Sequence, residues 1–148
     1  MKIFVDNDVI LDVLLERKDF EYSRELLTYV EQKQVKAYTS AIIFTNSFYI
    51  ISKLRNKKIA WSALKKIRLL FSVSKLNEKV IDLALASDFS DFEDAVQYYC
   101  ALEQKVDYLV TRNKRDYAAT GIPIATPQEL IAIVKSSWEL EPITVSSL

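Results

Sequence analysis

Five short apolar runs, separated by stretches with helical periodicity, constrain the fold of this chain more than any other feature of its sequence. The runs are rich in β-branched and aromatic residues and read IFVD, VKAYTS, FSVSKL, YLVTR and IPIATP, at residues 3–6, 35–40, 71–76, 108–112 and 122–127. Strands that alternate with helices form mostly parallel sheets, which helices cover on both faces. We therefore predict an α/β fold, a single three-layer domain with a mostly parallel sheet of about five strands flanked by helices.

The helices are predicted from apolar residues that recur every three or four positions. They begin near Val9 and then cover residues 21–32, 40–55, 59–70, 78–86, 90–104 and 127–135. Asn77 and Thr126 are expected to cap the helices that follow them. Ser90 and Glu93 fit a capping box, which predicts that a helix begins at Ser90.

The length and composition fit one globular domain. With 148 residues, of which 50% are hydrophobic and 27% charged, the chain is long enough for one core and short for two. We assign residues 1–135 to this domain and residues 136–148 to a C-terminal tail, either loose or a strand that pairs with another copy. No apolar stretch reaches the roughly 18 residues of a membrane span, and the N-terminus lacks the order of a signal peptide. We therefore expect a cytoplasmic protein without a membrane partner.

Two absences exclude whole classes of enzyme. The chain has no histidine, which excludes Ser-His-Asp and Cys-His nucleophile systems and the usual zinc sites. Its single glycine, Gly121, cannot build the glycine-rich loops that bind the phosphates of ATP or NAD. The lone Cys100 lies in an apolar helical pattern and is interpreted as a small core residue. Any catalysis by this chain must therefore use carboxylates.

Acidic and amide side chains follow two of the predicted strands and begin one helix. Asp6 ends the first strand and Asp8 follows it, Asp94 lies in the first turn of a helix, and Asn113 and Asp116 follow the fourth strand. The carboxyl ends of parallel strands open on one edge of the sheet, where ligands bind. Carboxylates that meet there repel one another unless a cation neutralises them or one takes up a proton. Mg²⁺ or Mn²⁺ prefers such oxygen ligands and promotes phosphodiester cleavage without histidine.

Each of these residues also has a purely structural interpretation. Asp6 alone is as readily a turn former or a helix N-cap, and Asp94 could serve only the helix dipole. Asp12 is interpreted as a solvated or locally paired side chain, and Asp91 and Glu93 as capping groups. Three basic side chains either face water or contact the phosphates of an RNA: Arg112, Lys114 and Arg115. The hypothesis of a metal site therefore depends on the combination of acids.

The segments that carry these residues resemble the motifs of the PIN domain, a small metal-dependent nuclease fold found in the toxins of VapBC-type toxin–antitoxin pairs. The resemblance covers residues 1–134 and includes four segments, FVDNDVILDVL, TSAIIFTNSFYIISK, DFEDAVQYYCAL and YLVTRNKRDY. By position, Asp6 resembles the first metal-site acid, Asp8 its supporting polar partner and Asp94 the third acid. This chain has Asn46 where the family usually has a glutamate, and Asn113 where it usually has a fourth acid.

The resemblance implies a ribonuclease that uses Mg²⁺ or Mn²⁺, acts on RNA, forms homodimers and pairs with an antitoxin that covers its site. In this interpretation Asp6 and Asp94 hold the ion, and Asp116 replaces the missing fourth charge from the same loop. Asp8 orients ligands or water. Three further side chains support the site, beside the ion or as weak ligands: Asn46, Thr111 and Asn113.

Two other functions remain open on the sequence alone. The opening IFVDNDV also resembles haloacid dehalogenase-like phosphatases, in which Asp6 would be the nucleophile and Asp8 the general acid. That family needs a late acidic pair after a glycine, and SDFED offers only a loose version. The amides of Asn46 and Asn113 instead suggest a PIN-like module that binds RNA or protein without cleavage, because an amide oxygen brings no charge to a cation.

Overall fold

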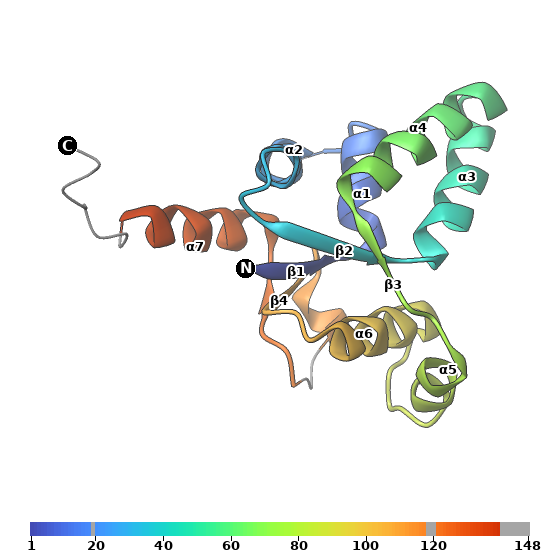
Figure 1. Ribbon diagram of the computed structural model, residues 1–148. Coiled ribbons are helices and arrows are strands. Elements are labelled where there is room, and N and C mark those ends of the chain that lie inside the picture. Colours follow the sequence, from blue (N-terminus) through green and yellow to red (C-terminus); the bar gives the residue numbers. More distant parts are fainter. Residues whose placement is uncertain (19, 118–120, 140–148) are drawn as a thin grey trace.

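The computed structural model describes residues 1–18, 20–117 and 121–139 and arranges them around one central sheet (Figure 1). The predicted strands and helices are present in the predicted order. They are β1 (Lys2–Val5), α1 (Asn7–Leu14), α2 (Phe20–Glu31), β2 (Lys36–Ser40), α3 (Ile42–Leu54), α4 (Lys57–Leu70), β3 (Ser72–Ser74), α5 (Glu78–Leu85), α6 (Phe92–Gln104), β4 (Tyr108–Val110), the 3-10 helix η1 (Lys114–Tyr117), β5 (Ile124–Ala125) and α7 (Pro127–Glu139).

All paired strands of the sheet run parallel, as predicted. Their order is β3-β2-β1-β4-β5, so β1 is central and the chain crosses from one side of it to the other between β3 and β4. Ile3 of β1 pairs in register with Ala37 of β2 and with Tyr108 of β4. The border between β1 and β4 is therefore a topological switch point, where open parallel sheets form a crevice at the carboxyl ends of their strands.

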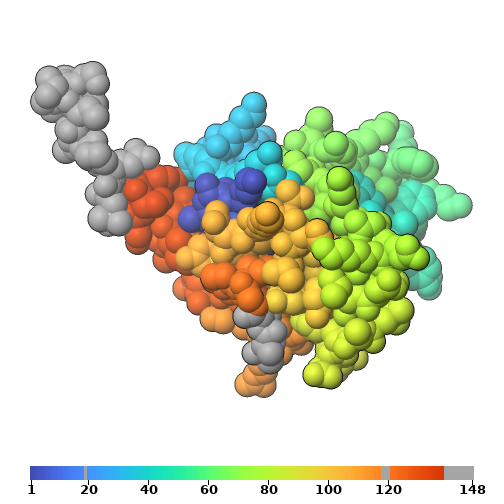
Figure 2. Space-filling view, turned by 60° about the horizontal axis from the view of Figure 1, so that its bottom comes forward, coloured from blue at the N-terminus to red at the C-terminus, as the bar shows by residue number. Residues whose placement is uncertain are grey.

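Helices cover both faces of the sheet because β1 is apolar on both sides, and the fold has the three predicted layers. Ile3 and Val5 belong to one core, together with Leu26 of α2. Phe4 lies between them in sequence and belongs to the opposite core, together with Val96 of α6, since successive strand residues point to opposite faces. Figure 2 turns the face covered by α5 and α6 toward the viewer.

Two of the predicted helix caps are confirmed. The side chain of Asn77 accepts a hydrogen bond from the backbone N–H of Val80 at 3.1 Å, at the start of α5. Thr126 accepts one from the N–H of Glu129 at 3.2 Å at the start of α7, and Glu129 accepts one in return from the N–H of Thr126. These bonds satisfy backbone donors that a helix leaves free in its first turn.

The start of α6 differs from the prediction. The helix begins at Phe92, and its N-cap is Asp91, whose carboxylate accepts a hydrogen bond from the N–H of Asp94 at 2.9 Å. The predicted capping box of Ser90 and Glu93 is wrong, because Asp91 caps the helix and the carboxylate of Glu93 contacts two other helices instead. Asp91 is a capping group, as predicted, and it places Asp94 in the first turn.

The C-terminal helix is longer than expected. Helix α7 continues to Glu139, past residue 135, where we expected a tail to begin. The rest of the predicted tail, residues 140–148, lies outside the described residues. Among the described helices, none is both long and apolar enough to cross a membrane. Cys100 is buried in the core, as predicted.

Candidate functional site

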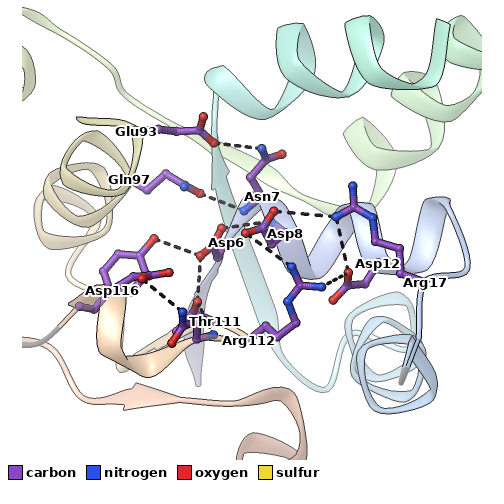
Figure 3. Close-up of polar contacts among 12 residues, drawn as sticks. Asp6, Asn7, Asp8, Asp12, Arg17, Glu93, Gln97, Thr111, Arg112 and Asp116 are labelled. Atoms are coloured by element: carbon purple, nitrogen blue, oxygen red, sulfur yellow. Dashed lines mark hydrogen bonds and ion pairs between the residues drawn. The ribbon is translucent and has the colours of Figure 1, made fainter. Parts of the chain in front are cut away.

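Asp6 stands at the switch point of the sheet, directly after β1. Its backbone N–H donates to the carbonyl of Val110 in β4 at 2.9 Å, which extends the pairing of these strands. The residue is 3% exposed, and its carboxylate accepts three hydrogen bonds (Figure 3). Oδ1 accepts from the N–H of Asp8 at 3.1 Å, and Oδ2 accepts from the hydroxyls of Thr111 at 2.9 Å and Tyr117 at 3.1 Å. Asp6 is therefore the N-cap of α1 and also a buried acceptor at the carboxyl edge.

The environment of Asp6 disfavours its negative charge. Burial is the largest effect and raises the pKa of Asp6, although the hydrogen bonds from Asp8, Thr111 and Tyr117 act in the opposite direction. Burial and the nearby charges of Asp6 and Asp94 raise the pKa of Tyr117 as well, so its hydroxyl stays a proton donor. A carboxylate has about four acceptor positions. One position on Asp6 thus remains for another partner.

Asp94 lies in the first turn of α6 and is half-buried. Burial contributes most to a rise in the pKa of Asp94 to about 7. Four negative charges add to this effect, those of Asp6, Asp91, Asp116 and Glu93. Such effects act over short distances, so Asp94 shares the carboxyl edge with Asp6 and Asp116. Within the described part of the chain, however, no three acidic or cysteine side chains are arranged closely enough to hold a metal ion by themselves.

The loop after β4 links Asp116 to Asp6 through a series of contacts. The exposed Asp116 accepts a hydrogen bond at Oδ1 from the side-chain amide of Asn113, at 3.3 Å. The backbone N–H of Asn113 donates to the hydroxyl oxygen of Thr111 at 3.3 Å, and this hydroxyl donates to Asp6. The predicted loop residues thus lie together, and Thr111 contacts Asp6 directly.

A second group of acids lies on α1 and is paired with arginines; we call it the acid–arginine cluster, formed by Asp8, Asp12, Arg17 and Arg112 (Figure 3). The side chain of Asp12 is 4% exposed and lies 2.7 Å from Arg112 Nη1 and 3.7 Å from Arg17 Nη1. Burial nevertheless outweighs both arginines and raises the pKa of Asp12. Asp8 is exposed, 3.9 Å from Arg112 and 4.0 Å from Arg17. Asp12 is thus buried rather than solvated. It pairs with Arg17, which is near in sequence, and with Arg112, which is distant.

The basic residues after β4 differ in their partners. Arg112 belongs to the acid–arginine cluster, and Lys114 forms an ion pair with Glu129 of α7 at 3.2 Å. Arg115 is exposed and forms no ion pair within residues 1–18, 20–117 and 121–139. Of the three basic residues predicted to contact RNA, Arg112 and Lys114 are thus paired with acids. Arg115 has no acidic partner in the described part of the chain.

Glu93 connects α6 to two other helices at the site. Its Oε1 accepts a hydrogen bond from the side-chain amide of Asn7 in α1 at 3.0 Å, and its Oε2 accepts one from Asn46 in α3 at 2.9 Å. The interpretation of Glu93 as a capping group is therefore wrong. Asn46, one of the predicted supporting residues, reaches the site edge through this carboxylate.

Two residues of the site, Asn7 and Gln97, were not predicted from the sequence. The side-chain oxygen of the buried Gln97 accepts a hydrogen bond from the backbone N–H of Asn7 at 2.9 Å (Figure 3). Gln97 follows Glu93 by one helical turn, so the two side chains share a face of α6. A polar residue among the apolar positions in the middle of α6 was the signal that could have identified Gln97.

The donor set at Asp6 and Asp94 fits a hard divalent cation. Within the described residues, no lysine or arginine forms an ion pair with Asp6 or Asp94. One buried amide oxygen nearby, Asn7 Oδ1, has no hydrogen-bond partner in the described structure. The ligands available are carboxylate and amide oxygens, and the chain has no histidine. Mg²⁺ and Mn²⁺ prefer such oxygen ligands, whereas zinc usually takes nitrogen or sulfur ligands.

The sheet order and the acidic carboxyl edge together define the class of this protein. The family model for the PIN domain matches residues 2–115, and the chain belongs to this family. It is also 26% identical over 134 residues to Ribonuclease VapC1 of Aquifex aeolicus (strain VF5), a match that covers 86% of this chain and 92% of that protein.

Solved structures share the fold at low sequence identity. VapBC2 from Rickettsia felis, solved bound to a DNA fragment from its promoter, matches with a TM-score of 0.65 and 16% identity over 85% of this chain and 98% of the matched chain. The Mycobacterium tuberculosis toxin VapC20, described as cleaving the sarcin–ricin loop, matches with a TM-score of 0.64 and 16% identity, over 81% and 95% of the two chains. VapBC-1 from nontypeable Haemophilus influenzae has a TM-score of 0.65 at 13% identity, over 86% and 99%.

Membership of the PIN family excludes one of the functions that the sequence left open, the phosphatase. The phosphatase alternative was based on the opening motif with Asp6 and Asp8, and the PIN match extends far beyond that motif to residue 115. The haloacid dehalogenase-like interpretation is therefore wrong. The choice between a nuclease and a binding module depends on the chemistry of the site.

Proposed function

We propose that this protein is a metal-dependent ribonuclease that hydrolyses RNA phosphodiester bonds and is the toxin of a toxin–antitoxin pair. Residues 1–135 are its nuclease domain. Membership of the PIN family and the similarity to Ribonuclease VapC1 support the activity. The observation that carries the proposal is the pair of acids Asp6 and Asp94, which share the carboxyl edge and have no cationic partner among the described residues.

Asp6 and Asp94 are the residues that hold Mg²⁺ or Mn²⁺, and Asp116 assists from the segment after β4, since the three carboxylates are not close enough in the described structure to share an ion. When bound, such an ion lowers the pKa of a water molecule and stabilises the charge that develops on a phosphate. Thr111 and Tyr117 orient Asp6 through hydrogen bonds to Oδ2, which leaves the direction of its free acceptor position fixed. Asp8 orients water or ligands at the exposed rim of the site.

Glu93 compensates for the amide at Asn46. The PIN family usually has a glutamate at the position of Asn46, and here the side-chain amide of Asn46 donates to the carboxylate of Glu93 at 2.9 Å. A negative charge is therefore present at this place, but α6 supplies it and α3 does not. Asn113 likewise lies 3.3 Å from Asp116, so an acid accompanies each of the two amides. This pattern supports cleavage over binding alone.

The partners follow from the same family. The Rickettsia felis and Haemophilus influenzae neighbours are described as VapBC, which supports an antitoxin as the partner of this chain. Exposed aromatic side chains on the α3–α4 pair, Tyr49 and Trp61, each 60% exposed, offer an apolar surface for a second protein chain, and we propose that a homodimer or the antitoxin covers it. The basic residues Arg112, Lys114 and Arg115 contact the RNA backbone.

The test is a titration of the purified protein with Mn²⁺ in the presence of a short, fluorescently labelled RNA. We expect the RNA to be shortened with Mn²⁺ and to remain intact with EDTA. Asp94→Asn should lose this cleavage, whereas Asp82→Asn, at an exposed acid on α5, should retain it. A rise in fluorescence anisotropy without shortening of the RNA at any Mn²⁺ concentration would contradict the nuclease and identify a binding module.

A further inference from the structure

A hollow of about 440 Å³ opens beside Asp116, between the loop that joins α5 to α6 and the 3-10 helix η1. We call it the α5–α6 hollow. The residues that matter for its chemistry are Ser87, Asp88, Phe89, Tyr99, Arg115 and Asp116. Asp116 belongs to the proposed metal site, so the hollow adjoins that site directly. Its volume lies within the range of small-ligand pockets and is large enough for a base with its sugar.

Aromatic rings form one side of the hollow and are held in place by other rings. The ring centroids of Phe89 and Tyr99 are 6.4 Å apart, with an interplanar angle of 66°. Phe89 also packs on Tyr98 at 5.4 Å and on Tyr117 at 6.1 Å. Both Phe89 and Tyr99 are half-buried, so part of each side chain stays accessible. Accessible aromatic side chains of this kind stack on unpaired bases in proteins that bind single-stranded RNA.

The same tyrosine connects the hollow to the proposed metal site. Tyr117 packs on Phe89 through its ring and donates its hydroxyl hydrogen bond to Asp6 at 3.1 Å. Tyr117 thus lies between Phe89 and Asp6 and contacts both. This arrangement suits a base next to the phosphate on which the site would act.

Two charged side chains of the hollow, Arg115 and Asp88, form no ion pair among the described residues. Arg115 is the basic residue after β4 that forms no ion pair in the described part of the chain, and it lines the hollow. A guanidinium binds phosphate oxygens and also stacks on planar rings. Asp88 is exposed and forms no ion pair in the same described ranges. Its carboxylate accepts hydrogen bonds, which adenine, cytosine and guanine donate through an exocyclic amino group, whereas uracil has only carbonyl oxygens as exocyclic groups and donates only from N3.

We infer that the α5–α6 hollow binds one unpaired base of the RNA substrate, next to the cleaved phosphate. The base stacks on Phe89 and Tyr99, Arg115 contacts the neighbouring phosphate, and Asp88 favours a base with an exocyclic amino group. A base inside a duplex is already stacked on its neighbours, so the substrate is a single strand or a loop. This inference rests on the proposed function, because it takes RNA as the substrate.

The experiment measures RNA binding and RNA cleavage separately. Binding is measured in EDTA by the anisotropy of short fluorescein-labelled oligoadenylate, oligocytidylate and oligouridylate, and cleavage is measured with Mn²⁺. Tyr99→Leu keeps the apolar packing and should weaken binding of oligoadenylate by about 5- to 150-fold, the range found when a stacking side chain is removed. It should raise KM in the cleavage assay and leave kcat within a few-fold. Arg115→Gln changes an exposed side chain and should also weaken binding, and Asp88→Asn should reduce the preference for oligoadenylate over oligouridylate.

Matched controls lie on α2, on the opposite face of the sheet (Figure 1). Tyr22→Leu and Arg24→Gln change exposed side chains of the same types there and should bind every RNA as the wild type does. If the wild type cleaves RNA while Tyr99→Leu and Arg115→Gln bind it as tightly as the wild type, the hollow is no base site and only the ribonuclease stands. If the wild type binds RNA without cleavage and both variants lose binding, the hollow stands and the proposed ribonuclease falls.

Discussion

Two groups of acids at the carboxyl edge of the sheet differ in one respect, their counter-charge. In the acid–arginine cluster, Asp8 and Asp12 face the guanidinium groups of Arg17 and Arg112, the closest contact being 2.7 Å. Asp6 and Asp94 have no such partner among the described residues. Both groups contain a buried carboxylate, Asp6 at the N-cap of α1 and Asp12 in the second half of that helix. The difference separates acids that are paired within the fold from acids that are available to a ligand.

The absence of a counter-charge disfavours the ionised form of Asp94. Burial and four neighbouring negative charges raise the pKa of Asp94 to about 7, so the cation-free site opposes ionisation near neutral pH. A group held in an unfavourable ionisation state at the switch point of a sheet is typical of a functional site. In the acid–arginine cluster two half-exposed arginines offset part of the same cost for the buried Asp12, although burial still raises the pKa of Asp12. Four predictions test this contrast.

The largest effect is expected from Asp6→Asn. The substitution should reduce Mn²⁺-dependent cleavage by more than about a hundredfold, because it removes a proposed ligand rather than a residue that supports one. The thermal midpoint should stay unchanged or rise, since the Asn oxygen still caps α1 and the hydroxyls of Thr111 and Tyr117 rotate to accept hydrogen bonds. Asp12→Asn is the matched control and should keep its kcat. Cleavage by Asp6→Asn at the wild-type rate would remove Asp6 from the site.

A smaller effect is expected from Glu93→Gln. Loss of this charge between Asn7 and Asn46 should weaken Mn²⁺ binding by about 10- to 100-fold, as measured by isothermal titration calorimetry. The double variant Asn46→Glu with Glu93→Gln restores a carboxylate and an amide in exchanged positions and should regain most of this affinity. Glu103→Gln, at an exposed residue of the same helix, is the control. If the double variant binds Mn²⁺ more weakly than Glu93→Gln alone, the charge at this place does not serve the metal.

Asp12→Asn should affect stability rather than catalysis. It removes a buried charge whose pKa is raised even though two arginines face it, so the free energy of unfolding at neutral pH should rise slightly. Loss of the ion pairs costs little because Arg17 and Arg112 are partly exposed and can be solvated. Urea denaturation of this variant and of Asp82→Asn provides the comparison. A clear fall in the free energy of unfolding for Asp12→Asn would show instead that its ion pairs outweigh the cost of burying its charge.

The smallest effect concerns the pH dependence of stability in EDTA. The pKa of Asp94 in the folded protein is about 7, above its ordinary value of 3.8, so protonation favours the folded state. The free energy of unfolding should therefore fall as the pH rises from about 4 to about 7 and then level off. Asp94→Asn removes this loss, so its thermal midpoint should exceed that of the wild type by a few degrees above about pH 7 and match it near about pH 4. A gain that is larger at low pH would contradict the raised pKa.

Local patterns predicted the elements and the general position of the acids. Apolar residues that alternate, or that recur at helical spacing, show which faces of a strand or helix are buried. This pattern can be read from the segment alone, without its neighbours in the fold. Asp6 was predictable because it ends an apolar strand, and Asp94 because it follows a helix start by a few residues. The N-cap of α6 was predicted one residue too early, at Ser90 instead of Asp91. Both residue types are good N-caps, and the sequence does not show which of the two side chains accepts the hydrogen bond from the first turn.

Local sequence patterns could not predict the contacts between segments that are distant in the sequence. The pairing of Arg112 with Asp12 spans 100 positions, and the bond from Asn46 to Glu93 spans 47. Each depends on how one helix or loop is rotated against another, which the packing of two separate cores decides. The same packing places Arg115 beside Phe89 and Tyr99 and leaves it without an acidic partner in the described structure.

The sequence by itself determined a mostly parallel α/β sheet with carboxylates after its first strand, since the strands, the helices and their burial follow from apolar periodicity and from the alternation of the two. Only the tertiary structure decided which of these carboxylates an arginine neutralises and which remain without a cation. The physical reason is that electrostatic energy depends on distances between side chains, and those distances are set by packing across the fold rather than by neighbours in the chain.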